Sequence, residues 1–542
     1  MQNVVFHIQE MNSGSAIIKV SGNAHCQVPF YASINKLEGT GPLWQPVTIE
    51  TLPDGPLLEM FSLYVEEAYE ACDLDGVFGI KQLEAWCTLV HVCQRWRTLV
   101  FASPRRLNLR LVCTSGTPVR EMLNIWPTTL PIVVHARFEG IRSLTGMGKD
   151  WKNADSFIVA LKHRDRVCEI GFWSPPLDQL PAFVEILQGS FPALTRLHLC
   201  TEWFEFPVLH PDSFLGGSAP RLRSLTLDGI RFPELPKLLL SSRDLVELRL
   251  RDIPHSGYIS PEAIATCLSS LTSLKKLSLT FVSPQSLLDE ASRHLPASAC
   301  VDIPGLVQLE LHGVNDYMED LVSRINAPRL THVIISFFGD RQFDISQFGQ
   351  FIRRVQNFQV LHRVRVKLDD SEGDLRAQFI LFADPTDGTT LGFSFSGIEL
   401  ESEHPSLAVL STSSLSPFRL SSFERLELWN AYSPPGYWET AIQNTQWSKR
   451  FQQFTAVKDL YLEDELAIPV ARTLRHLTGK RATEMLPALQ NIFIKRSIGF
   501  FEGDTESFSR GNVPLGVVLQ EIEPFIVTRQ LSSCPVAVQY WN

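Results

Sequence analysis

The length, composition and charge of the chain limit what kind of protein it can be. Its 542 residues exceed what one small core needs, and 44% are hydrophobic against 20% charged, which is typical of several folded domains or one long repeat array. The net charge of −10 at pH 7 argues against a nucleic-acid-binding protein, because phosphates are bound by clustered Lys and Arg.

The cysteines and the apolar runs point to an intracellular protein. The ten cysteines are scattered, without the CxxC pairs typical of zinc sites and without a disulfide framework. Residues 1–10 lack a basic segment followed by an apolar core, and no apolar run reaches the roughly 18–20 residues of a membrane-spanning helix. We therefore expect a cytoplasmic and/or nuclear protein that binds no membrane, metal or cofactor.

The first recognisable element is a helix that begins just after Thr51. Residues 1–50 show no clear pattern and form an unassigned lead-in, which we expect to be loosely ordered or separately docked. Thr51 is a capping candidate, Pro53 suits a first turn, and Asp54 would lie near the positive end of the helix. Apolar residues then recur at three- and four-residue steps along one helix face: Leu57, Leu58, Met60, Phe61, Tyr64 and Ala68.

A second helix is predicted from about Lys81 to Phe101. It ends at Ser103-Pro104, because a proline cannot continue the helix. Its apolar stripe consists of Trp86, Leu89, Val90, Cys93, Trp96 and Val100. Between the two helices we expect an acidic loop, with Glu66, Glu67, Glu70, Asp73 and Asp75.

The order of these residues resembles the F-box. That family's pattern opens with Leu-Pro, continues with an apolar helix ending in Ile-Phe, and closes with a Val-Cys-x-x-Trp helix. The match is carried here by Leu52-Pro53, by residues 57–61 and by residues 89–97. Residues 101–107 and 118–131 are also similar to F-box proteins abundant in mushroom-forming fungi. The acidic insertion after Phe61 departs from the usual spacing, and it either hinders docking of a partner or bulges away from it.

The resemblance implies a three-helix module at residues 51–104 that binds a Skp-type adaptor and, through it, a cullin-RING ubiquitin ligase. In such helix-on-helix binding, aromatic and aliphatic anchors supply most of the energy. The adaptor-binding residues that it implies are Leu52, Pro53, Leu57, Leu58, Met60, Phe61, Leu89, Val92, Cys93 and Trp96. The simpler interpretation of the same apolar stripes is an ordinary helical core.

A second signal is the pattern apolar-x-x-apolar-x-apolar, which returns about every 28 residues, the period of leucine-rich repeats. Each unit would supply a short strand, followed by a helix or an irregular segment. The Asn or Cys that usually follows the third apolar residue is mostly absent, so we expect irregular, degenerate repeats. The copies start at Val167, Leu194, Leu222, Leu245, Leu274, Leu306, Leu330, Leu361, Phe423, Val457 and Leu489.

Together these signals predict an α/β protein, a small helical F-box followed by an irregular leucine-rich-repeat solenoid with parallel strands on the concave face. Residues 105–166 would be a connector and entry cap, residues 167–498 the repeats, and residues 499–542 a C-terminal loop and cap. The period breaks between the copies at Leu361 and Phe423, so we expect an irregular insertion near 370–420. Residues 391–396 alternate like a strand or hairpin.

Polar residues between the apolar positions would face solvent and line an extended binding surface of the kind that repeats form. For any single one of them, a solvated strand face is the simpler interpretation. The target-binding candidates are Arg196, His198, Arg223, Glu247, Arg249 and Lys276. Further residues at such positions are Thr226, Ser278, Gln308, Glu310, Arg363, Arg365, Arg425, Glu427, Asp459 and Tyr461.

No sequence motif indicates an enzyme. Residues 140–149 superficially resemble a phosphate-binding loop, but Ser143 stands where its first Gly belongs and Asp150 replaces the required Ser or Thr. GxSxG, HExxH and GxGxxG motifs do not occur. We expect a ubiquitin-ligase substrate receptor without catalytic residues, which acts by holding a target protein close to the ligase. The alternatives are an F-box scaffold that works outside a ligase, and a leucine-rich-repeat interaction protein with an unrelated helical head.

Overall fold

The computed structural model divides the chain into two compact units, residues 1–64 and 65–542. It describes residues 5–10, 16–21, 29–32, 52–70, 85–114, 117–137, 154–173, 180–201, 211–230, 235–253, 257–282, 300–338, 346–359, 361–371, 374–382, 390–396, 420–430, 452–477, 479–495 and 515–541. The two units are described separately below.

The first unit contains a small antiparallel sheet in the segment that the sequence left unassigned. Its strands are β1 (Val5–Glu10), β2 (Ala16–Ser21) and β3 (Pro29–Ala32), in the order β1-β2-β3. Helix α1 (Asp54–Glu70) starts where the sequence predicts, with Asp54 in its first turn and the Leu57 amide donating to the Pro53 carbonyl at 3.2 Å.

The predicted acidic loop and second helix are both partly wrong. Glu66, Glu67 and Glu70 belong to α1 rather than to a loop, while residues 73 and 75 lie outside the described residues. The second helix is two helices, α2 (Ala85–Val90) and α3 (Gln94–Ala102). They are separated because Cys93 has an extended backbone and caps α3, its Sγ accepting from the Trp96 amide at 3.5 Å. A helix pattern continues in phase across such a short break, so the sequence does not reveal it.

The second unit is built on a 16-stranded sheet, with strand order β21-β20-β19-β18-β15-β16-β17-β14-β12-β10-β9-β8-β7-β6-β5-β4. Every pairing in this sheet is parallel except those of β16, which is antiparallel to β15 and β17. The strands are β4 (Leu111–Cys113), β5 (Ile132–Arg137), β6 (Val167–Trp173), β7 (Arg196–Cys200), β8 (Ser224–Asp228), β9 (Glu247–Ile253), β10 (Lys276–Phe281), β12 (Gln308–Gly313), β14 (His332–Phe338), β15 (Arg363–Ser371), β16 (Asp374–Phe382), β17 (Thr390–Ser396), β18 (Arg425–Asn430), β19 (Asp459–Glu463), β20 (Asn491–Lys495) and β21 (Ala537–Trp541).

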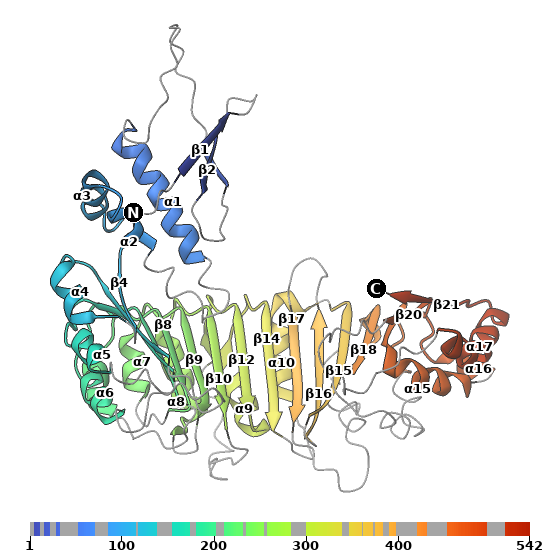
Figure 1. The fold of residues 1–542 in the computed structure, drawn as a ribbon. Helices are drawn as coiled ribbons and strands as arrows, with labels where there is room; N and C mark the ends of the chain where they lie inside the picture. Colours follow the sequence, from blue (N-terminus) through green and yellow to red (C-terminus); the bar gives the residue numbers. More distant parts are fainter. Residues whose placement is uncertain are drawn as a thin grey trace, which may run out of the picture. The chain divides into compact units, whose positions relative to one another are not determined.

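Helices alternate with the strands, and Figure 1 shows α7 to α10 running along the sheet. Their bounds are α4 (Val119–Ile125), α5 (Ala154–Leu161), α6 (Leu180–Leu187), α7 (Leu235–Ser241), α8 (Pro261–Ser270), α9 (Asn315–Ser323), α10 (Ser346–Arg354), α15 (Asp464–Arg475), α16 (Lys480–Glu484) and α17 (Leu515–Leu531). The 3-10 helices are η4 (Pro211–Gly217), η7 (Gln356–Phe358) and η8 (Leu420–Ser422), and a separate parallel pair is formed by β11 (Val301–Asp302) and β13 (Ile325–Asn326). None of the helices in the described ranges is long and apolar enough to span a membrane.

The repeated apolar pattern predicts the strands correctly. Each copy leads into one strand of the sheet, from β6 to β20, and the paired apolar residues form in-register rows inside the core. One such row has exposed fractions of 1% or less and consists of Leu197, Leu225, Leu248, Leu277 and Leu309. Burial of this apolar surface is the main stabilising term for such a sheet. The result is a repeat-like α/β architecture.

The sheet also contains strands that the pattern does not predict. β4 and β5 extend it before residue 167, and β21 pairs with β20 at the other end. The alternation at residues 391–396 does mark a strand, β17, but β17 pairs with β14, and β16 then separates it from β15. The described part of the predicted insertion therefore adds two strands, β16 and β17, within the sheet. β16 pairs antiparallel with β15 as in a hairpin, and β17 then pairs with β14.

Candidate functional site: the polar face of the sheet

The side chains that alternate with the buried leucines form the polar face of the sheet. Because parallel strands are paired in register, these side chains line up across neighbouring strands in rows. From β6 to β12 the first row is Glu169, Arg196, Ser224, Glu247, Lys276 and Gln308. The second row is Gly171, His198, Thr226, Arg249, Ser278 and Glu310.

These rows bring together five of the six predicted target-binding residues. Arg223 is the exception, because it precedes β8 and Ser224 occupies its place in the first row. The backbone of Arg223 instead links neighbouring repeats, with its amide donating to the Thr195 carbonyl at 2.7 Å and its carbonyl accepting from Val246 at 2.7 Å.

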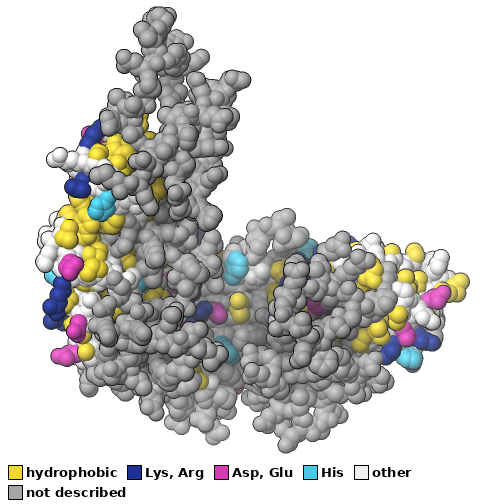
Figure 2. Space-filling view, viewed as in Figure 1, with side chains coloured by type: hydrophobic (Ala, Val, Ile, Leu, Met, Phe, Trp, Pro, Cys, Tyr) yellow, Lys and Arg dark blue, Asp and Glu magenta, His cyan; other side chains and the backbone are white. Residues whose placement is uncertain are grey.

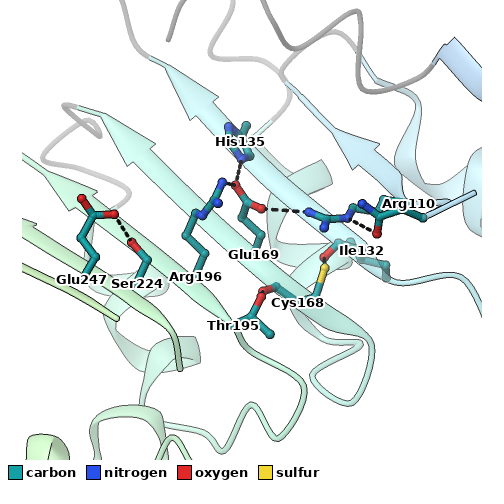
Figure 3. A network of polar contacts seen from close by, with 10 residues as sticks. Arg110, Ile132, His135, Cys168, Glu169, Thr195, Arg196, Ser224 and Glu247 are labelled. Carbon is teal, nitrogen blue, oxygen red and sulfur yellow. Dashed lines mark hydrogen bonds and ion pairs between the residues drawn. The ribbon is translucent and has the colours of Figure 1, made fainter. Parts of the chain in front are cut away.

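Glu169 on β6 is the centre of one cluster on this face, which Figure 3 shows in close-up. Its carboxylate lies 3.2 Å from Arg110 Nη1, 3.1 Å from His135 Nε2 and 3.3 Å from Arg196 Nη1. We call these four residues the Glu169 cluster. The Glu169 side chain is 8% exposed, so its charge is compensated mainly by these neighbours.

The Glu169 carboxylate is ionised at neutral pH. Burial opposes its charged form, but the hydrogen bond with His135 and the charges of Arg196 and Arg110 outweigh burial, so the pKa of Glu169 lies below its ordinary value of 4.5. Glu169 is not among the predicted target-binding residues, although it occupies the same position in its repeat as Arg196 does in the next. The spacing pattern applied to the first copy identifies it.

An aromatic patch adjoins the Glu169 cluster. The ring of Trp173 lies across Gly171, where an added Cβ would approach it to 2.7 Å. The Trp173 ring centroid is 5.5 Å from that of His135 and 4.7 Å from that of His198. Burial, together with the charges of His135 and nearby arginines, lowers the pKa of His198 to about 4, so this ring is neutral at pH 7. The patch therefore offers flat rings beside charged groups.

In the middle of the face the predicted residues pair with one another. Arg249 Nη2 lies 2.6 Å from Glu247 Oε1, and the hydroxyl of Ser224 donates to Glu247 at 3.2 Å. Ser278 donates to Glu310 at 2.8 Å, and Arg251 lies 3.4 Å from the same carboxylate. Much of the charge in the middle of the face is thus neutralised within the face. Figure 2 also shows basic and acidic side chains beside one another at the end of the sheet that carries α15 to α17.

A second charged cluster lies further along the polar face, on β15 and β18. The Glu427 carboxylate is fully buried by three arginines, with Arg363 Nη2 at 2.8 Å, Arg365 Nε at 2.7 Å and Arg425 Nε at 2.7 Å. We call these four residues the Glu427 cluster. Burial opposes ionisation of Glu427, but hydrogen bonds from Arg363 and Arg365 outweigh it and hold the pKa below 4.5.

Aromatic rings surround the Glu427 cluster. The guanidinium of Arg425 lies 3.7 Å from the ring centroid of Tyr461, and that of Arg365 lies 4.4 Å from Trp429. Arg363 lies 4.3 Å from the ring of Phe382. We call Phe382, Trp429, Tyr461, Phe493 and Trp541 the aromatic rim, in which Tyr461 stacks on Phe493 at 4.4 Å and meets Trp541 edge-on at 5.2 Å.

The residues predicted to bind an adaptor differ in their exposure. Those that the chain itself buries, at 6% exposure or less, are Leu57, Phe61, Leu89 and Trp96. The half-buried ones are Leu52, Leu58 and Met60. Pro53, Val92 and Cys93 are exposed. The exposed residues, and the exposed parts of the half-buried ones, can supply surface to a partner. The four buried residues contribute to the packing of the chain itself.

The described residues include no group of three or more His, Cys, Asp or Glu side chains that could hold a metal ion. Burial raises the pKa of both Cys168 and Cys267 to about 11, so these thiols stay protonated and weakly nucleophilic at neutral pH. Residues 140–150, with their superficial phosphate-loop pattern, lie outside the described residues.

The fold and this face define a class: an α/β protein with a long, mostly parallel, repeat-like sheet that presents rows of polar side chains from β6 to β12 and a second charged cluster on β15 and β18. No family model matches the sequence, and no curated protein matches it significantly. A more specific identity therefore depends on the residues themselves.

Proposed function

We propose that this protein is the substrate receptor of a Skp–cullin–F-box ubiquitin ligase. The observation that carries the proposal is the order of its parts, in which α1, α2 and α3 precede a repeat-like sheet with a polar face. This is the order that the F-box resemblance at residues 51–104 implies. In this role the chain performs no chemistry and raises the effective concentration of the target at the ligase.

The adaptor would be bound through apolar side chains that the helices leave exposed. Val92, in the turn between α2 and α3, is 52% exposed. Exposed aromatic and aliphatic residues on helices are the usual anchors of helix-on-helix binding. The target would be bound by the polar face, whose clusters combine charged groups with aromatic rings.

One observation favours a second candidate, a repeat-based interaction protein that binds no Skp-type adaptor. Four of the ten residues that the resemblance assigns to the adaptor are buried within the chain, Trp96 among them. A helical head that buries its signature residues needs no partner to cover them. The two candidates differ in a single measurable property, which is affinity for the adaptor.

The test is titration calorimetry of the full chain with a fungal Skp-type adaptor. Val92→Asp places a charge on the proposed interface and should weaken binding at least tenfold, because an unpaired charge at an apolar contact is costly. Ile125→Asp is the matched control, since Ile125 on α4 is 71% exposed and lies outside the predicted module. No binding by the folded chain would favour the second candidate, whereas equal binding by both variants would contradict the proposed contact at Val92.

A further inference from the structure

The Glu427 cluster carries a surplus of positive charge. Three guanidinium groups surround one ionised carboxylate, so the cluster has a net charge of +2 in a chain whose net charge is −10. On the neighbouring strands Glu463 lies 3.6 Å from Lys495, whereas Asp459 accepts a hydrogen bond at 2.8 Å from the neutral Asn491 and keeps its charge. Even with Asp459 counted, the described residues leave a surplus of one positive charge for an anion from outside the chain.

The three guanidinium groups are held in place before any ligand arrives. Each forms an ion pair with Glu427 and lies over an aromatic ring: Arg363 over Phe382, Arg365 over Trp429 and Arg425 over Tyr461. Cation–π contact fixes a guanidinium plane, and a fixed fork loses less entropy when it binds an oxyanion. Their side chains remain 21–31% exposed, so a ligand can reach them.

We propose that the Glu427 cluster and its aromatic rim bind an acidic peptide segment of the target, with one carboxylate or phosphate group seated on the arginines. Guanidinium forks match both oxyanions in bidentate geometry. The half-buried rings of Trp429 and Trp541 would pack against an apolar or aromatic neighbour of the acidic residue. This inference specifies the target class within the proposed function and rests on it.

The charge pattern favours a peptide over a nucleic acid. A nucleic acid needs a basic stripe that follows several successive phosphates. Here the surplus is confined to one cluster, and the next strand, β19, carries Asp459 and Glu463. The charge of Asp459 would repel a second phosphate next to a bound one, whereas a peptide can present a single anionic group.

The test is fluorescence anisotropy of the full chain with a short fluorescein-labelled peptide that carries one Glu between two Tyr residues and is otherwise neutral. Three further probes replace Glu with Gln, replace Glu with phosphoserine, or are oligothymidylate of matched length. The Glu peptide should bind, the Gln peptide should bind at least tenfold more weakly, and oligothymidylate should bind more weakly than the Glu peptide. Tighter binding of the phosphoserine peptide than of the Glu peptide would identify phosphate as the source of the anion.

Variants connect the binding to the cluster. Arg365→Gln with Arg425→Gln should weaken binding of the Glu peptide at least tenfold, and Arg425→Lys should fall in between because it keeps the charge and loses the planar fork. Glu427→Gln should strengthen binding about threefold or more, because it raises the surplus charge. A purely structural role of the cluster predicts the opposite sign for Glu427→Gln. Arg472→Gln with Arg475→Gln on α15, both paired with Glu521, is the matched control and should change nothing.

Circular dichroism melting checks that each variant is folded. If Glu427→Gln is unfolded, the affinity of Arg425→Lys for the Glu peptide, compared with that of wild type, tests the role of the cluster instead. Equal binding of the Glu and Gln peptides would overturn the inference, as would unchanged binding by the double arginine variant, or tighter binding of oligothymidylate. Adaptor affinity is measured on the same preparations. Loss of adaptor binding with peptide binding intact would refute the receptor proposal alone, and the reverse result would refute the peptide site alone.

Discussion

Replacement of Arg529 by Met should selectively destabilise the C-terminal end of the sheet. Arg529 on α17 is 1% exposed, and its guanidinium donates to backbone carbonyls that include those of Ala482, Leu486 and Leu489, at 3.1, 3.2 and 2.9 Å. Through these bonds one side chain ties α17 to α16 and to the segment between α16 and β20. Met keeps the apolar stem and removes all the donors.

The magnitude follows from the carbonyl groups that lose their partner. Each buried carbonyl without a hydrogen bond costs about 1–3 kcal/mol, although some of these groups would recover water. Leu486 has a φ of 48°, which is unfavourable for a residue other than glycine, and its carbonyl accepts a hydrogen bond from Arg529. Loss of that bond removes one of the contacts that hold this strained backbone in place. We expect a loss of about 3–5 kcal/mol in the local free energy of unfolding, the usual cost of breaking a buried polar network.

The assay is amide hydrogen exchange with mass spectrometry, because a repeat-like sheet can open at one end while the rest stays folded. Exchange in residues 480–541 should accelerate by a factor of about 100 or more, since each 1.4 kcal/mol is tenfold. Strands β7–β10 should be unaffected. Arg475→Met is the control, because Arg475 is 53% exposed and forms a surface pair with Glu521. A change below tenfold, or a uniform change along the chain, would refute the argument.

Three further predictions concern the polar face. Glu169→Gln should lower the free energy of unfolding by about 2 kcal/mol at pH 7, because it leaves the adjacent arginines without their anion. The pKa of Glu169 is lowered in the folded state, so its carboxylate stabilises wild type above the ordinary pKa of 4.5 and loses this effect as pH falls below it. The difference in unfolding free energy between wild type and variant, measured by urea titration, should therefore shrink in acid. A difference that does not depend on pH would contradict this expectation. Gly171→Ala should displace the Trp173 ring and cost about 1–3 kcal/mol, seen as a changed near-ultraviolet circular dichroism spectrum, and an unchanged spectrum would argue against the contact. Burial, and after it the charge of Asp252, raises the pKa of Asp228 to about 6, so wild type loses stability as pH rises from about 4 to 6. Asp228→Asn should therefore stabilise the protein at pH 7.5 by about 1 kcal/mol, a figure reduced for the partial exposure of the side chain. The gain in stability should disappear below pH 4 in thermal melts. A variant less stable than wild type at pH 7.5 would contradict the prediction.

The strands were predictable because their signal is local and repeated. In each copy the apolar side chains that alternate along a strand point into the core, and the same spacing returns unit after unit, as at Leu225, Leu248 and Leu277. The neighbours of β15 were not predictable, because pairing depends on where the chain turns back. The hairpin of β15 and β16 places two strands between β14 and β15 without disturbing the apolar pattern of either.

The sequence predicts which residues lie on the polar face, but it does not predict which of them form ion pairs with one another. Spacing alone assigned Arg425 and Glu427 to solvent-facing positions, yet Glu427 is fully buried. Its burial results from Arg363 and Arg365 on another strand, and Glu169 is similarly covered by Arg110, 59 residues away. Such contacts depend on which strands become neighbours, and the pattern within a single repeat carries no information about that. The break between α2 and α3 was missed for a local reason, because Cys93 is an uncommon capping residue.

In the proposed function this chain joins a cullin-bound adaptor through its helices. The most direct test is size-exclusion chromatography with light scattering of the full chain mixed with a purified fungal Skp-type adaptor and cullin. We expect one equimolar complex of the three proteins, which Val92→Asp disrupts and Ile125→Asp leaves intact. Separate elution of a folded full chain would contradict the receptor proposal and leave a repeat-based interaction protein in its place.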